Sequence, residues 1–281
     1  MLTIFTIPKL FADDIGLIQR NAIASWRRLA PRIELILFGA DAGVAEAANE
    51  FGARHEPVVA TNAYGTPLIS DAFAKARRIA TQPLLMYSNA DMLYNESLPR
   101  ALKAVVDRGS FLLSGQRWDL DIEHDLVTAS DEHWCALFDQ RSIRGRLHGF
   151  AAMDYFVFPR MLDFGMPGFA VGRIGWDSWL VWRCRQLGIP VIDATADVAA
   201  LHQNHSYSSL ARGCQIWHGP ERDLNIRQAG GLRHLLTLRE ASHQLVAGRV
   251  RTAAGWRRCT AWLATRSAYL RLLAFKRWLQ H

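Results

Sequence analysis

The chain has 281 residues, of which half are apolar and 21% are charged. This is the composition of an ordinary globular protein, and it excludes a disordered chain, a collagen-like repeat and a small disulfide-rich scaffold. The formal net charge of +7 is concentrated near the end of the chain, because residues 231–281 contain ten Lys or Arg and a single acid, Glu240. Residues 1–230 are close to neutral, so a nucleic-acid partner is not expected for the folded body.

The sequence predicts a cytoplasmic protein. No run of about 18 apolar residues is present, so no membrane-spanning helix is expected. Residues 1–8 lack a basic stretch and a small-residue cleavage site, and they are expected to form a first strand and not a signal peptide. The four cysteines are scattered and form no Cys-x-x-Cys pair, so neither a zinc site nor a disulfide framework is expected.

The first hundred residues alternate between strand and helix patterns. Short apolar runs indicate strands, and longer segments with apolar residues three or four apart indicate helices. In chain order we expect a strand at 2–7, a helix at 13–29, a strand at 33–38, a helix at 42–51, a strand at 55–59, a loop at 62–67, a helix at 68–80 and a strand at 83–87. This alternation predicts an α/β, Rossmann-like fold with a mostly parallel central sheet flanked by helices.

The second half of the chain is less regular. Strands are expected at 110–115, 151–159 and 191–193, and a helix at 176–187. From about residue 229 the sequence becomes basic and helix-like, without a clean apolar stripe. We therefore expect one domain over residues 1–228 and a basic helical C-terminal extension over residues 229–281.

Ligands of parallel α/β sheets bind beyond the carboxyl ends of the strands. The loops after Ile7, Phe38 and Tyr87 are therefore the first places to search for a site. No Gly-x-Gly-x-x-Gly motif follows the first strand, and no P-loop is present. Dinucleotide-dependent oxidoreductases and P-loop NTPases thereby lose their main sequence support.

Two segments carry candidate metal ligands. In Tyr87-Ser88-Asn89-Ala90-Asp91, an apolar strand leads directly to a carboxylate, which suits a divalent cation. His202 and His205 stand three residues apart and flank two amides, and imidazole suits Mn and Zn. The alternatives are that Asp91 caps a turn or helix, and that the two histidines lie on a surface turn.

Two further segments carry candidate acids. Glycines at 172 and 175 precede Trp176 and Asp177 at a helix start, where a partly desolvated Asp could act as a base and a Trp could stack on a sugar. The alternative is a carboxylate that complements the helix dipole, with the tryptophans in the core. Asp154 lies among apolar residues after Gly149 and needs a partner, either structural or functional.

The order of these motifs resembles the GT-A fold of nucleotide-sugar-dependent glycosyltransferases. In that family a DxD-type metal motif ends a strand, and a glycine-containing acceptor loop, an acid at a helix start and a late metal-binding His follow. Asn89-Ala90-Asp91 stands at the DxD position, Gly149 in the acceptor loop, Asp177 at the helix start, and His202 or His205 at the late His. The chain looks like uncharacterised bacterial glycosyltransferase-like proteins over roughly residues 1–225.

The resemblance implies a site for each substrate. Asp91, His202 and His205 would hold Mn or Mg, Asp177 would be the catalytic base of an inverting reaction, and a retaining reaction would not need that base. The acceptor would contact Gly149, Asp154 and Trp176. The donor, a nucleoside diphosphate sugar, would contact Thr6, Pro8, Lys9, Asp41, Asn62, Gly65, Thr66, Asn89 and Asp91. The sequence departs from the family at Asn89, where an amide replaces the first acid and would bind a metal more weakly.

The implied function is transfer of a sugar to a hydroxyl acceptor, a glycan or a lipid-linked molecule, in bacterial surface polysaccharide synthesis. The basic tail would either lie on an anionic membrane or pack as helices with solvated arginines. One alternative is a non-catalytic glycan-binding or scaffolding protein on a transferase fold. A sugar-1-phosphate nucleotidyltransferase is disfavoured, because residues 6–11 lack the glycine-rich loop that such an enzyme needs.

Overall fold

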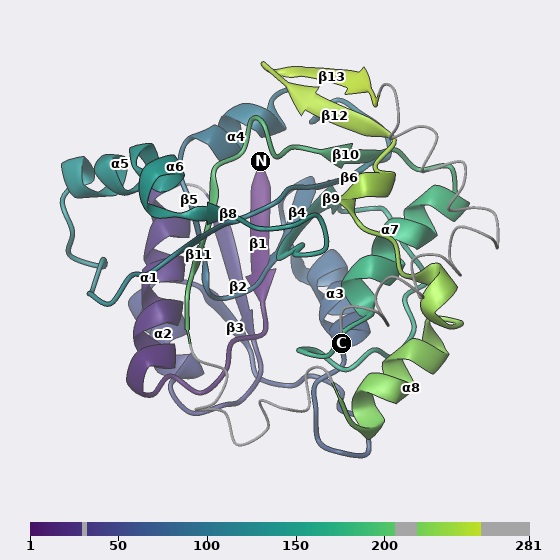
Figure 1. Cartoon of the computed structure of the whole chain (residues 1–281). Coiled ribbons are helices and arrows are strands. Elements are labelled where there is room, and N and C mark those ends of the chain that lie inside the picture. The colour runs from purple at the N-terminus through teal and green to yellow at the C-terminus, as the bar shows by residue number, and fades with distance from the viewer. Residues whose placement is uncertain (30–32, 206–217, 254–281) are drawn as a thin grey trace.

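The computed structural model describes residues 1–29, 33–205 and 218–253. Within these residues the chain forms a nine-stranded sheet and a separate four-stranded sheet. Helices cover both faces of the larger sheet, as Figure 1 shows. The predicted α/β class with a mostly parallel, helix-flanked sheet is confirmed.

The larger sheet is parallel around its centre. Strand β1 pairs in parallel with both of its neighbours, whereas β9 runs antiparallel to its own two neighbours. The spatial order is β13 (Arg249–Thr252), β12 (His243–Val246), β10 (Val191–Asp193), β6 (Leu112–Ser114), β9 (Tyr155–Pro159), β4 (Leu84–Ser88), β1 (Leu2–Thr6), β2 (Glu34–Phe38) and β3 (Arg54–Glu56).

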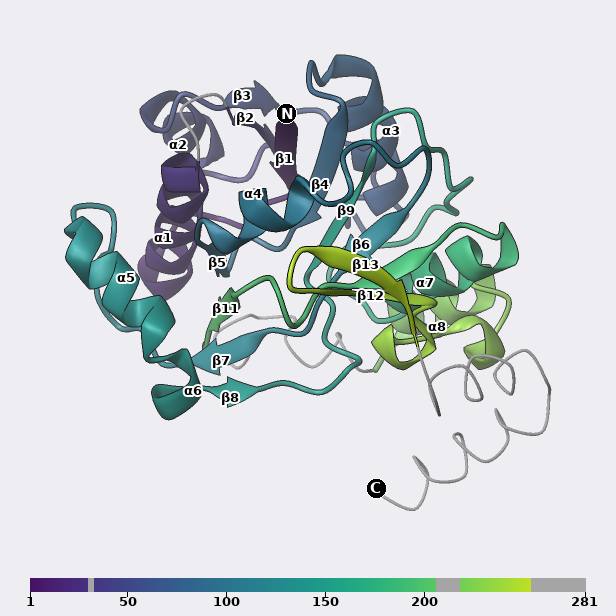
Figure 2. The same cartoon turned by 90° about the horizontal axis from the view of Figure 1, so that it is seen from above.

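The smaller sheet carries much of the site described below. Its order is β5 (Met92–Tyr94), β11 (Ala200–Gln203), β7 (Trp118–Leu120) and β8 (Arg146–Leu147). Seen from above, β7, β8 and β11 lie together with α5 and α6 on one side of the molecule (Figure 2). Its strands are only two to four residues long.

Each face of the larger sheet has its own hydrophobic core. Alternate side chains of β1 show this directly, because Leu2 and Ile4 belong to one core and Phe5 to the other. Burial on both faces explains why the central strands read as continuous apolar runs. The first core includes residues from α1 (Asp13–Leu29), α2 (Val44–Glu50), α4 (Ser97–Leu102) and α5 (Asp131–Asp139), and the second includes residues from α3 (Ile69–Ile79) and α7 (Trp176–Gln186).

The remaining helical segments are short. Helix α6 (Arg141–Arg144) has no buried residue, and α8 (Pro220–Gln228) buries Glu221 and Asn225. Two 3-10 turns follow, at Leu232–His234 and Leu238–Glu240. In the described residues, no helix is long and apolar enough to cross a membrane.

The expected helical extension from residue 229 is wrong for residues 243–252, which form the β12–β13 hairpin at the edge of the larger sheet. A tight turn at Ala247 and Gly248 makes the hairpin possible, with φ of 51° and 69°. Asp197 fixes this turn by accepting hydrogen bonds from both backbone amides, at 2.8 and 2.7 Å. Residues 254–281, the rest of the expected extension, lie outside the described residues, so the domain boundary after residue 228 stays a prediction.

Candidate active site

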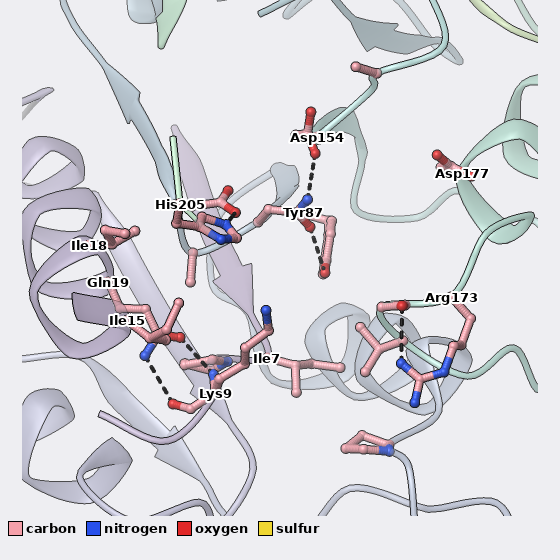
Figure 3. Close-up of a pocket in the computed structure, with 18 of the residues that line it drawn as sticks. Ile7, Lys9, Ile15, Ile18, Gln19, Tyr87, Asp154, Arg173, Asp177 and His205 are labelled. Atoms are coloured by element: carbon pink, nitrogen blue, oxygen red, sulfur yellow. Dashed lines mark hydrogen bonds and ion pairs between the residues drawn. The ribbon is translucent and has the colours of Figure 1, made fainter. Parts of the chain in front are cut away.

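A pocket of about 700 Å³ lies beyond the carboxyl ends of β1 and β4. Its volume falls in the usual range for small-molecule sites. Figure 3 shows Lys9, Asp154, Arg173, Asp177 and His205 arranged around it, and these residues come from four separate segments of the chain. The position agrees with the expectation that ligands bind at the strand ends of the sheet.

Most of the residues singled out in the sequence do line this one pocket. They come from the loops after β1, β2 and β4, from the loop before α3, from the entry to β9 and from the start of α7. The predicted residues in the lining are Pro8, Lys9, Asp41, Gly65, Thr66, Asn89, Asp91, Asp154, Asp177 and His205.

Five predicted residues lie outside the lining. Thr6 and His202 are buried, and Gly149 is exposed on a loop. Asn62 shapes the loop that presents Gly65 and Thr66, because its Oδ1 accepts hydrogen bonds from the amides of Tyr64 and Thr66.

Trp176 corrects the prediction of a sugar-stacking surface. The side chain is buried, with ring centroids 5.0 Å from Tyr87, 5.4 Å from Phe156 and 6.3 Å from Phe73. It therefore packs in the core beneath the pocket and presents no face to a ligand. The helical spacing in the sequence could not show whether Trp176 faces the pocket or the core, since either orientation fits the first turn of α7.

Asp91 lies in the sharp turn between β4 and β5, and two histidines converge on it. Strand β11 pairs antiparallel with β5, with His202 opposite Met92, which brings His202 beside the preceding Asp91. The Nε2 atoms of His202 and His205 lie 3.6 and 3.3 Å from Asp91 Oδ2. One potential ligand atom from each of the three residues can be chosen so that all lie within 4.8 Å of one another.

Asp119 orients His202 from the opposite side of the ring. Strand β7 pairs with β11 so that Asp119 is opposite His202, and Oδ1 of Asp119 lies 3.4 Å from His202 Nδ1. A carboxylate at one ring nitrogen leaves the other nitrogen available as a ligand, an arrangement common in metal sites. The sequence did not reveal Asp119, although its alternation with Arg117 on one face of a short strand was a weak signal.

The chemistry of the cluster fits a divalent cation. Asp91 Oδ1 is buried and, within the described part of the chain, accepts no hydrogen bond. Such an atom is costly to bury unless a ligand or ion satisfies it. Two imidazoles and one carboxylate suit Mn²⁺ well, whereas Mg²⁺ prefers oxygen ligands alone.

Charge within the cluster sets its protonation. Burial alone would raise the pKa of Asp91. The positive charges of His202 and His205, and the hydrogen bonds that they donate, hold that pKa well below its usual value. Burial lowers the pKa of His202, yet Asp91 and Asp119 outweigh it and raise the pKa to about 9. A cation binding here therefore displaces a proton from His202, so its affinity should increase with pH.

Asp177 is the second chemically distinctive group. It lies in the first turn of α7, half-buried, and its Oδ1 accepts a hydrogen bond of 2.7 Å from the amide of Ser178. Burial and the nearby charge of Asp154 raise its pKa to about 6, although backbone hydrogen bonds oppose the shift. A carboxyl group with this pKa can accept a proton near neutral pH.

Three cationic side chains, Lys9, Arg117 and Arg173, line the pocket, and of these only Lys9 was expected from the sequence. Gln19 clamps the backbone of Lys9, accepting from its amide at 2.7 Å and donating to its carbonyl at 3.0 Å. Burial and the charge of Arg173 lower the pKa of Lys9, against the opposing effect of Asp91. Arg173 is held by Glu221 at 2.7 Å, and Glu221 also accepts from Asn62 at 2.8 Å.

Comparisons with known proteins give a distant likeness. No family model and no curated protein matches the chain. A glucosyl-3-phosphoglycerate synthase of Mycobacterium tuberculosis, solved with Mn²⁺, UDP and glucosyl-3-phosphoglycerate, is 14% identical, with 82% of this chain and 80% of that chain covered and a TM-score of 0.45. A mannosyltransferase of Pyrobaculum calidifontis, solved with GDP-Man and Mn²⁺, is 16% identical, with 99% and 79% covered and a TM-score of 0.48.

Both are GT-A type nucleotide-sugar glycosyltransferases. At identities of 14% and 16% and TM-scores below 0.5, however, the likeness is too distant to assign a reaction. The chemistry of this chain has to be inferred from the residues of its own pocket.

The raised pKa of Asp177 predicts a stability effect that does not depend on any activity. Because its folded-state pKa of about 6 lies above the unfolded value, ionisation of Asp177 disfavours the folded state above pH 6 and has no effect below about pH 4. We expect Asp177→Asn to raise the urea unfolding midpoint at pH 8, with the difference disappearing towards pH 4.

Asp163→Asn is the matched control, because an ion pair with Arg77 and a backbone hydrogen bond lower the pKa of Asp163. This variant should instead lose stability at pH 8. A lower unfolding midpoint for Asp177→Asn at pH 8 would contradict the assigned pKa.

Proposed function

We propose that the protein transfers a sugar from a nucleoside diphosphate sugar to an acceptor hydroxyl. The observation that carries this proposal is the joint lining of one pocket by Asp91 and His205 of the cation site and by Asp177, a carboxyl group with a pKa near 6. Glycosyl transfer to a hydroxyl needs both functions, because the leaving diphosphate carries charge and the acceptor must lose a proton.

The donor lies along the strand ends. Lys9 supplies positive charge to the diphosphate, and its position is fixed by the clamp of Gln19. Gly65 has a φ of 76° and open space around its α-carbon, so the backbone there can approach a phosphate or ribose closely. Asp41, in the loop after β2, lines the same pocket and accepts hydrogen bonds from the ribose hydroxyls in this proposal.

Asp91, His202 and His205 would hold Mn²⁺ or Mg²⁺, with Mn²⁺ the better match to two imidazoles. When bound, the cation offsets the charge of the departing nucleoside diphosphate.

Asp177 takes the proton from the acceptor hydroxyl as that oxygen attacks the anomeric carbon. The oxygen attacks from the face opposite the leaving group, so the reaction inverts the configuration of the sugar. The acceptor enters along residues 151–154 and Arg173, which line the pocket near Asp177. A lipid-linked or glycan acceptor, a role in bacterial surface polysaccharide synthesis and a membrane contact through the basic tail stay predictions.

A thermal-shift screen tests the donor class. We expect one of UDP, GDP, CDP or their sugars to raise the melting temperature, and the shift to require Mn²⁺ or Mg²⁺, because a ligand that binds only the folded state stabilises it. Asp91→Asn should abolish the metal-dependent part of the shift, and Asp107→Asn, on an exposed turn after α4 and outside the pocket lining, should retain it. No shift with any nucleotide from folded protein would instead favour a glycan-binding or scaffolding role.

Turnover tests the role of Asp177. With the donor identified by that screen, Asp177→Asn should lower kcat by about 10²–10⁴-fold and leave nucleotide binding unchanged, because only proton transfer is removed. The wild-type kcat/KM should fall as pH drops through about 6, where Asp177 becomes protonated. Loss of nucleotide binding in Asp177→Asn would make this residue a donor contact and not the base.

A further inference from the structure

The amide at position 89 is explained by the residue across the strand pair. Strands β4 and β9 run antiparallel with Ser88 opposite Tyr155, so Asn89 and Asp154 are opposite each other one step beyond the paired strands. The backbone amide of Asn89 donates to the backbone carbonyl of Asp154 at 2.8 Å, which extends the hydrogen bonding between β4 and β9 by one residue. Residues opposite each other on neighbouring strands have adjacent side chains.

These side chains form a complementary pair. Asn89 Nδ2 donates to Asp154 Oδ1 at 2.6 Å, and Asn89 Oδ1 accepts from the hydroxyl of Tyr87 at 3.2 Å. Both ends of the Asn89 amide are therefore engaged within the protein. An Asp at position 89 would bring two carboxylates together in a site where Asp154 is only 8% exposed, and like charges at that distance are strongly unfavourable.

Asp154 also joins a chain of ion pairs that leads to the cation ligands. Its Oδ2 accepts from Arg117 Nη1 at 2.7 Å, and Arg117 Nε donates to Asp119 Oδ1 at 2.9 Å. Asp119 is the carboxylate that faces His202 Nδ1. The Arg117 side chain is 12% exposed, so its charge depends on these two carboxylates for compensation.

We propose that Asn89 is a positioning residue and not a metal ligand: its amide holds Asp154, which holds Arg117 and, through it, Asp119 behind His202. Asp91 is then the sole cation ligand that the Asn89-Ala90-Asp91 motif supplies. The role toward the cation rests on the proposed function, whereas the pairing itself does not.

A reciprocal exchange tests the pair on metal-free protein. Asn89→Asp and Asp154→Asn should each lower the melting temperature by about 4–8 °C, because each breaks a buried charge-assisted hydrogen bond. Asn89→Ala, which removes the side-chain amide without adding charge, should lower the melting temperature less than Asn89→Asp does. The double variant Asn89→Asp/Asp154→Asn restores one amide, one carboxylate and the net charge, and should recover most of the loss.

Asn49→Asp, on the exposed side of α2, is the matched control for added charge and should leave the melting temperature nearly unchanged. If the double variant's melting temperature falls by the sum of the decreases in the two single variants, the pairing of Asn89 with Asp154 is overturned. A single Asn89→Asp variant as stable as wild type would overturn it as well.

Mn²⁺ affinity of the same proteins, measured by titration without nucleotide, tests the link to the cation ligands. Asp154→Asn should weaken Mn²⁺ binding about tenfold, because Arg117 is left under-compensated beside the site. Asn89→Asp should also bind Mn²⁺ more weakly than wild type, and the affinity of the double variant should return to within about threefold of the wild-type value. Tighter binding by Asn89→Asp than by wild type, with Asn89→Ala weaker, would identify position 89 as a direct ligand and overturn the proposal.

Absence of Mn²⁺ binding by the wild type would overturn the proposed cation role and this link together. The metal-free melting temperatures would still decide whether Asn89 and Asp154 act as a pair.

Discussion

The pairing of β11 between β5 and β7 is the constraint on which the site depends. It places His202 next to Asp91 on one side and opposite Asp119 on the other, although these residues are far apart in the sequence. Strand β11 is held in turn by Gln203, whose side chain bonds Asn21 and the carbonyl of Ile18 in α1. A slip of one residue in this short strand would turn His202 away from both carboxylates, because successive side chains point to opposite faces.

The ionisable groups around the pocket alternate in sign. Asp91, His202, Asp119, Arg117 and Asp154 follow one another, each within 2.7–3.6 Å of the next. Such a network is stable only when every charge has its partner, because each group is largely removed from water. Asp177 forms no ion pair with any residue that the structure describes, and burial together with the charge of Asp154 raises its pKa into the range useful for proton transfer.

The fold could be predicted from the sequence where the pattern of apolar residues extends over a whole helix or strand. The helix expected at 13–29 is α1 with the same bounds. Of the four strands expected in the first hundred residues, three lie within a residue of their expected ends and the third stops at Glu56, whereas β5 was not expected. Prediction failed where elements are short or receive their partners from far away. The two to four residues of β7, β8 and β11 give too little pattern to reveal a strand, and the β12–β13 hairpin depends on Asp197, some fifty residues earlier.

Prediction of the site residues succeeded and failed for the same reasons. Asp91, Asp177 and the two histidines could be singled out because each follows a recognisable local signal. Arg117, Asp119, Arg173 and Glu221 could not, since their importance comes from contacts between distant segments. The reason for an amide at position 89 was likewise invisible in the sequence, because it lies in the charge of Asp154 across the strand pair.

The most direct test of this account is an anomalous-scattering measurement on crystals grown with Mn²⁺ and the nucleoside diphosphate that stabilises the protein. The account predicts a manganese peak within ligand distance of Asp91, His202 and His205, with the diphosphate beside it and Asn89 still bonded to Asp154. Nucleotide bound in the pocket with no manganese at Asp91, or manganese bound at Asn89 and away from the histidines, would contradict it.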